Sequence, residues 1–202
     1  MGNIVAIEHL TLDGVYQGPA RPDEDTRDGF THGGWGAAAG SDPKLQAAIG
    51  AHMGDAWSLL VGRVTYEDLY GFWPKQAPNP MTDALNNVEK FVASHNPDYP
   101  LPWQNSTLLQ GDAAEAVAKL KKEHDKTLVI FGSGVLVRSL IEYGLIDELV
   151  LQLHPLLLGK GRRLFEDTPH TKLKLSDSVT MDSGLIVATY QPAQKSSFIR
   201  SP

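Results

Sequence analysis

The stretch Thr127-Leu128-Val129-Ile130-Phe131-Gly132-Ser133-Gly134-Val135 carries the clearest structural signal in the chain. Its first five residues are rich in β-branched, aliphatic and aromatic side chains, which predict a buried strand. The small residues that follow predict a tight turn, and residues 135–143 predict a helix that Gly144 ends. A strand that enters a helix through a glycine-rich turn is the repeating unit of a parallel α/β sheet.

The same alternation continues on both sides of this stretch. Further strands are expected at 4–10, 57–61, 90–93, 107–109 and 149–153. Further helices are expected at 43–53, from Gly62 to about Phe72, at 81–87 and at 113–124. Two last strands, 173–180 and 185–190, flank an Asp-Ser-Gly turn and predict a hairpin. This order predicts an α/β fold with a mostly parallel mixed sheet and an antiparallel C-terminal hairpin.

Length and composition narrow the class of protein. The chain has 202 residues, a formal net charge of −6 and no cysteine. We expect one domain at 1–192 and a flexible polar tail at 193–202. The lack of cysteine excludes disulfides and thiolate catalysis, and the acidic balance predicts no nucleic-acid partner. The sequence shows no secretory pattern and no apolar run of about 18 residues, so we expect a cytoplasmic protein without a membrane partner.

Two strand-to-helix junctions are suited to a phosphate group. At the first, Gly132, Ser133 and Gly134 let the backbone approach a ligand, and free N–H groups start the helix. At the second, Gly62 permits close approach, Arg63 supplies a permanent charge and Thr65 supplies a hydroxyl. The first junction is also consistent with a tight turn that binds no ligand. The second is also consistent with a surface arginine beside a helix that Thr65 caps. Because ligands of open α/β sheets bind beyond the carboxyl ends of the strands, the pyrophosphate of a dinucleotide could lie across both.

A third position at the same edge is Asp13, which follows the first strand. This carboxyl group could hold a ring N–H of a substrate or relay a proton. The Asp13-Gly14 pair is also what an ordinary turn requires, and that alternative stays open.

Other catalytic patterns are missing from the sequence. The seven histidines show no metal-ligand spacing such as H-E-x-x-H, so we expect no metal site. Ser133 directly follows Gly132, which is not the G-x-S-x-G pattern of a hydrolase nucleophile.

Taken as an ordered set, several segments resemble the dihydrofolate-reductase-like superfamily. Within it the chain is similar to stand-alone relatives of the C-terminal reductase domain of bifunctional riboflavin-biosynthesis deaminase-reductases. The segments are TLDG at 11–14, HGGW at 32–35, LVGRVTYE at 60–67, FVAS at 91–94, GSGVL at 132–136, LIDEL at 145–149, PLLLGKG at 155–161 and LF at 164–165. The resemblance covers about residues 3–192 and implies a three-layer dihydrofolate-reductase-like domain.

The resemblance also implies a cofactor and a set of site residues. NADPH is the implied hydride donor, and its phosphates are implied to contact Gly62, Arg63, Thr65 and the turn Gly132, Ser133, Gly134, Val135 and Leu136. Ser94 is implied to lie near the adenosine ribose and its 2′-phosphate. Asp13 is implied to face the substrate pocket near the nicotinamide. The loop 14–40, with Trp35 and His32, is implied to form a lid over the substrate.

The function we expect is therefore an NADPH-dependent reductase that transfers a hydride to a small heterocycle resembling a pterin, a pyrimidine or a flavin precursor. Homodimerisation is expected from the resemblance. The alternative is a non-catalytic nucleotide-binding or ligand-sensing protein that retains the fold, because a fold does not determine a function.

Overall fold

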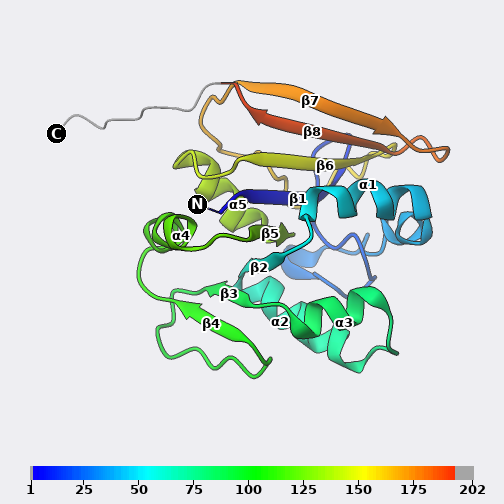
Figure 1. Ribbon diagram of the computed structural model, residues 1–202. Helices are drawn as coiled ribbons and strands as arrows, with labels where there is room; N and C mark the ends of the chain where they lie inside the picture. The colour runs from blue at the N-terminus through cyan, green and yellow to red at the C-terminus, as the bar shows by residue number, and fades with distance from the viewer. Residues whose placement is uncertain (1, 194–202) are drawn as a thin grey trace.

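A computed structural model describes residues 2–193, so most of the predicted tail lies outside the described residues. Figure 1 shows one sheet with helices on both of its faces. The strands are β1 (Ile4–Thr11), β2 (Trp57–Gly62), β3 (Lys90–Ala93), β4 (Ser106–Leu109), β5 (Thr127–Phe131), β6 (Glu148–His154), β7 (Leu173–Thr180) and β8 (Ile186–Pro192). The α-helices are α1 (Pro43–Met53), α2 (Arg63–Phe72), α3 (Pro80–Asn87), α4 (Ala113–Glu123) and α5 (Gly134–Glu142).

The sheet confirms the predicted fold class. Its strand order is β4-β3-β2-β5-β1-β6-β8-β7. All neighbours from β4 to β6 pair in parallel, whereas β8 runs antiparallel to β6 and to β7. The C-terminal hairpin is thus present, at the edge of the sheet. The order places β1 in the middle, between β5 and β6, which local sequence patterns do not reveal.

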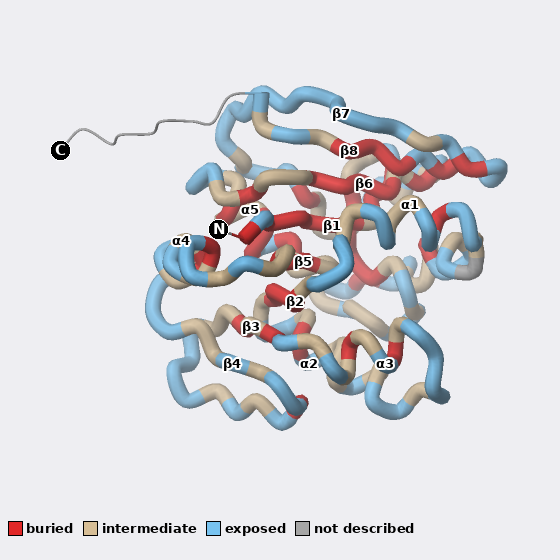
Figure 2. Tube along the Cα trace, viewed as in Figure 1, coloured by how far each residue is buried: buried red, intermediate tan, exposed pale blue. Residues whose placement is uncertain are grey.

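Two helical layers cover the sheet because strand side chains alternate between its faces. On one face, Val5, Ile7 and Val150 pack against Leu45 of α1, and the adjoining part of this face packs against α2 and α3. On the other face, Ile4, Ala6 and Ile130 pack against α4 and α5. Figure 2 shows that burial concentrates in the central strands, whereas β7 is exposed along most of its length.

The loop between β1 and α1 contains regular structure and long-range hydrogen bonds. It contains two short 3-10 helices, at Arg27–Gly29 and Ala37–Ser41, where no apolar period was visible. Its side chains instead bond to distant parts of the chain. Gln17, which is buried, donates to the carbonyl of Arg27 at 3.0 Å and accepts from the Arg162 N–H at 3.1 Å.

The helix starts fall into two groups. Asp42, Asn79 and Asp112 accept hydrogen bonds from the first-turn N–H groups of α1, α3 and α4, as N-cap residues do. Helix α2 begins after Gly62 and α5 after Ser133, and no described side chain caps either of them. The first N–H groups of α2 and α5 therefore remain available to a ligand.

Candidate cofactor and substrate site

The two uncapped helix starts lie next to each other. The backbone N–H of Gly62 donates to Ser133 Oγ at 3.0 Å, across 71 residues of sequence. A Cβ atom built on Gly132 would lie 3.7 Å from Thr65 Cγ2, so the second junction also contacts the first. The Thr65 hydroxyl does not cap α2. The junctions thus form one rim at the carboxyl edge of β2 and β5.

The backbone of the β5–α5 turn is shaped for close approach. Gly132 and Ser133 both adopt left-handed conformations, with φ of 66° and 64°. Gly134 is buried, and a Cβ atom there would lie 2.5 Å from Cζ of Tyr16, so only glycine fits beneath this ring. The Val135 side chain is 58% exposed, whereas Leu136 is buried. The N–H groups of this first turn lack helical acceptors and face the rim.

Arg63 is the first residue of α2 and is partly exposed at the rim. Its guanidinium donates to Glu67 at 2.7 Å, one turn along the helix, and lies 6.0 Å from the ring centroid of Tyr99. The Tyr99 hydroxyl donates to the same Glu67 carboxylate at 2.9 Å. Desolvation, with a contribution from Glu67, raises the pKa of Tyr99 to about 12, so this hydroxyl keeps its proton. An exposed ion pair of this kind is weak, so the guanidinium is free to turn toward an anion.

Ser94 lies one strand further along the same edge. Ala93, the last residue of β3, pairs with Gly62 at the end of β2, so Ser94 follows at the same height. Its hydroxyl accepts a hydrogen bond from the Asn96 N–H at 3.1 Å. Along this edge the order is therefore Ser94, then Gly62, then Ser133, and next the end of β1.

Asp13, at the end of β1, is committed to hydrogen bonds with other loops. Its carboxylate accepts from the Thr11 hydroxyl at 2.6 Å and from the N–H groups of Leu158 and Gly159 at 3.2 and 2.8 Å. The bond from Thr11, followed by those from the two backbone N–H groups, lowers the pKa of Asp13 to about 2. Asp13 is therefore ionised at neutral pH and joins the β1 turn to the 158–159 loop.

The loop 14–40 brings Trp35 onto the sheet but leaves His32 at the surface. The Trp35 indole donates to the Gln17 carbonyl at 2.8 Å, and its ring meets the ring of His154 edge-on at a centroid distance of 5.0 Å. The exposed His32 contacts Phe30, with ring centroids 5.8 Å apart. Arg21 of the same loop forms an ion pair with Asp68 of α2 and lies over the ring of Phe72. The loop thus spans from β6 to the helix that carries Arg63.

Sequence reasoning missed a polar group beneath Trp35. His9 of β1 and His154 of β6 are hydrogen-bonded to each other, with Gln152 beside them. No motif signals these residues, because they are 145 positions apart and each sits singly in an apolar strand. Only the pairing of β1 with β6 brings them together.

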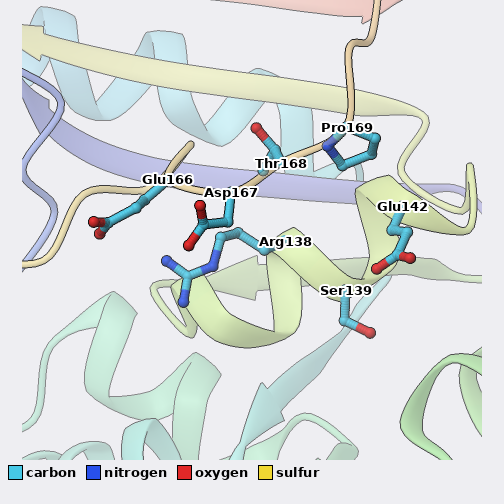
Figure 3. A pocket seen from close by; sticks show the side chains of 7 residues that line it. All are labelled: Arg138, Ser139, Glu142, Glu166, Asp167, Thr168 and Pro169. Carbon is cyan, nitrogen blue, oxygen red and sulfur yellow. The ribbon is translucent and has the colours of Figure 1, made fainter.

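A separate polar cavity lies on the outer side of α5. It has a volume of about 310 Å³ and is lined by Arg138, Ser139, Glu142, Glu166, Asp167, Thr168 and Pro169 (Figure 3). Its three carboxylates outnumber the single guanidinium, and it includes none of the predicted site residues. A net negative cavity repels phosphate, so it does not compete with the rim as a nucleotide site.

Residues 2–193 show neither a membrane span nor a cluster of metal ligands. They contain no helix long and apolar enough to cross a bilayer. Nor does this part of the chain bring together three His, Asp or Glu side chains in a group that could hold a metal ion.

The α/β architecture, the strand order and the glycine-rich rim define a reductase-like fold of the dihydrofolate reductase kind. The model of the RibD C-terminal domain family matches residues 6–187, so the chain belongs to that family. The uncharacterized protein YyaP of Bacillus subtilis is 30% identical over 140 residues, which cover 66% of this chain and 72% of YyaP.

Solved structures support the same fold at low sequence identity. A putative riboflavin biosynthesis protein from Shewanella sp. PV-4 has a TM-score of 0.71 and 22% identity, covering 96% of this chain and 100% of that one. The dihydrofolate reductase of Enterococcus faecalis, solved with NADP(H), has a TM-score of 0.60 and 18% identity, covering 96% of this chain and 98% of that one.

Proposed function

We propose that the protein is an NADPH-dependent reductase that transfers a hydride to a small heterocycle resembling a pterin, a pyrimidine or a flavin precursor. The observation that carries this proposal is the meeting of two uncapped helix N-termini, those of α2 and α5, with Arg63 beside them. Partial positive charge from both helices adds to the guanidinium charge, which suits a pyrophosphate.

The residues at the rim fit the proposed cofactor. Gly62 and Gly132 present no side chain, so phosphate oxygens can approach the backbone N–H groups of both turns. We assign Arg63 to one phosphate and Ser94, which follows a strand two positions from β5, to the adenosine end. Membership in the RibD C-terminal domain family and the likeness to a reductase solved with NADP(H) support the same assignment.

When bound, NADPH supplies the hydride, and the protein supplies orientation, exclusion of water and a proton. Trp35 lies against His154 at the end of β6, and its assigned role is to exclude solvent there. With its low pKa, Asp13 does not itself carry a proton at neutral pH. Its assigned role is to orient a water molecule that protonates the product.

Replacing Arg63 with alanine tests the cofactor site directly. Loss of a charge-assisted hydrogen bond to phosphate should weaken NADPH binding by about 1.5–3 kcal/mol. Isothermal titration calorimetry measures the change. Lys122→Ala, which removes an exposed positive charge from α4, is the matched control and should leave the affinity unchanged. Equal affinities for wild type and Arg63→Ala would rule out this placement of the phosphates.

Turnover separates the reductase from the non-catalytic alternative. We expect NADPH absorbance to fall when the protein is mixed with a reducible member of a panel of pterins, flavin precursors and keto-heterocycles. NADPH binding without oxidation across the whole panel would favour a ligand-sensing protein instead.

We further propose that the protein is cytoplasmic and forms a homodimer. Residues 149–153 lie in β6, between β1 and β8, and belong largely to the core. Exposed apolar side chains lie instead on the β7–β8 hairpin, where Leu175 and Ile186 are 49% and 37% exposed. Light scattering coupled to size-exclusion chromatography measures the oligomeric state.

A further inference from the structure

The polar group beneath Trp35 consists of His9, Gln152 and His154, which we call the histidine cluster. Gln152 and His154 are buried. His9 Nδ1 lies 2.9 Å from His154 Nε2, and Gln152 Nε2 lies 3.3 Å from His9 Nε2. The ring centroids of the two histidines are 5.2 Å apart. All three side chains extend from the strand ends toward the α1 side, because Ile7 and Val150 precede them on that face.

The hydrogen bonds of the cluster determine where its protons lie. Desolvation lowers the pKa of His9 to about 3 and that of His154 to about 4, so both rings are neutral at pH 7. The Gln152 amide donates to His9 Nε2, which leaves the His9 proton on Nδ1. His9 Nδ1 therefore donates to His154 Nε2, and His154 carries its own proton on Nδ1.

The Nδ1–H group of His154 is left as an available donor. It makes no hydrogen bond to any residue from 2 to 193. The described side-chain atoms that are both fully buried and without a hydrogen-bond partner are Glu8 Oε1 and Ser106 Oγ, so His154 Nδ1 is not fully buried. The loop residues Trp35 and Gly36 lie over this ring, and a Cβ atom on Gly36 would be 3.3 Å from His154 Cε1. The 14–40 loop thus borders the donor.

The strand order places the cluster beside the reacting end of the proposed cofactor. Ser94 follows β3, and the pyrophosphate rim follows β2 and β5. A dinucleotide that continues in the same direction reaches the end of β1 and then the end of β6, each strand adding about 5 Å. His9 lies two residues before the end of β1, and His154 is the last residue of β6.

The charges around the cluster indicate which substrates it accepts. Helix α1 contains no acidic residue. Its His52 bonds to Glu148 and Thr189, at the opposite end of β6. Glu8 lies on the other face of the sheet, with Ala6 and Leu10, and Asp13 is held by the 158–159 loop. None of these carboxylates is thus placed to pair with a substrate ring that carries a protonated amidine. The neutral N–H group of His154 is instead placed to donate to an acceptor atom of a neutral ring.

We propose that His154, positioned by His9 and Gln152 beneath Trp35, donates a hydrogen bond to a ring carbonyl of a neutral heterocyclic substrate. This inference rests on the proposed reductase function. In the reaction the carbonyl carbon accepts the hydride that NADPH supplies, and the π electron pair moves to the oxygen. A proton from solvent then completes the alcohol, while the nicotinamide is oxidised. A preorganised neutral imidazole donor stabilises the negative charge that develops on this oxygen.

Matched ligands test the proposal. The probes are lumazine, a pteridine with two ring carbonyls, and its diamino counterpart, in which amino groups replace both carbonyls. Fluorescence titration of NADP⁺-saturated protein should show about tenfold tighter binding of lumazine. His154→Phe should abolish this preference and leave NADPH affinity unchanged, and His154→Gln, which retains an N–H donor, should recover part of it. Absence of lumazine binding, or an unchanged preference in His154→Phe, would overturn the proposal.

Imidazole ¹⁵N NMR provides a readout that needs no ligand. We expect both histidines to be neutral and Nδ1-protonated at pH 7, and Gln152→Leu to disturb the His9 resonances. A proton on Nε2 of His154 would refute the assigned donor. Failure of NADPH to bind wild-type protein would instead refute the proposed function, whatever the state of the cluster.

Discussion

At the scale of single residues, Glu8 is the most unusual group in the described chain. It is 1% exposed in the middle of β1, and its Oε1 atom has no hydrogen-bond partner. Desolvation raises its pKa to about 8, and the same kind of burial, with Glu8 contributing, raises the pKa of the neighbouring Tyr16. Since alternation in a strand indicates only which residues share a face, the sequence did not predict that this carboxyl group would be sealed.

Glu8→Gln should change how stability depends on pH. Between about pH 6.5 and pH 7.5 the folded protein retains the Glu8 proton and the unfolded chain does not, so Glu8 should lower the free energy of unfolding by about 1.4 kcal/mol per pH unit there. His9 and His154 are neutral in the folded protein but partly protonated in the unfolded chain near pH 6.5, so they oppose this decline, and they do so equally in wild type and in Glu8→Gln. Urea unfolding at pH 6.5 and pH 8 should show that the free energy of unfolding of wild type falls relative to that of Glu8→Gln as the pH rises. Glu123→Gln, an exposed change on α4, should retain the wild-type slope, and a Glu8→Gln slope equal to it would disprove the shifted pKa.

At the scale of elements, the sequence predicted most strands and helices to within one or two residues, because apolar period, caps and glycines are local signals. Asp112 caps α4 as expected, and the 90–93 and 127–131 strands have the predicted bounds. The two 3-10 helices of the 14–40 loop were not predicted, because contacts to distant residues such as Arg162 and Asp68 hold the loop in place.

The junction between α2 and α5 leads to a prediction about Ser133. Its left-handed backbone costs about 1 kcal/mol for a residue with a Cβ atom, and its bond to the Gly62 N–H contributes about 1 kcal/mol. Ser133→Ala should lose the bond and keep the backbone cost, so it should destabilise the fold by about 1 kcal/mol. Ser133→Gly loses the same bond but relieves the backbone, so its free energy of unfolding should stay close to that of wild type. Chemical denaturation compares the two, and equal losses in both variants would mean that the backbone conformation carries no cost.

At the scale of the whole molecule, cofactor binding should stabilise the fold. NADPH at one hundred times its dissociation constant should add about 2.7 kcal/mol to the free energy of unfolding. For a chain of this size that corresponds to a rise of roughly 5–10 °C in Tm, measurable by differential scanning fluorimetry. NADH at the same concentration should give a smaller rise, because it lacks the 2′-phosphate assigned to the neighbourhood of Ser94. Equal shifts would contradict the preference for NADPH, and no shift with either nucleotide would contradict the cofactor site.

The sequence by itself determined the succession of strands and helices, the glycine-rich turns after β2 and β5, and the hairpin at the C-terminal end. These features depend on the chemistry of residues close together in the chain, so they can be read without knowing the fold. Only the tertiary structure decided that β1 lies between β5 and β6, that Ser133 contacts Gly62, and that His9 meets His154 beneath Trp35. Those contacts join residues far apart in the chain, and they arise from the packing of both helical layers on one sheet, which no local pattern encodes.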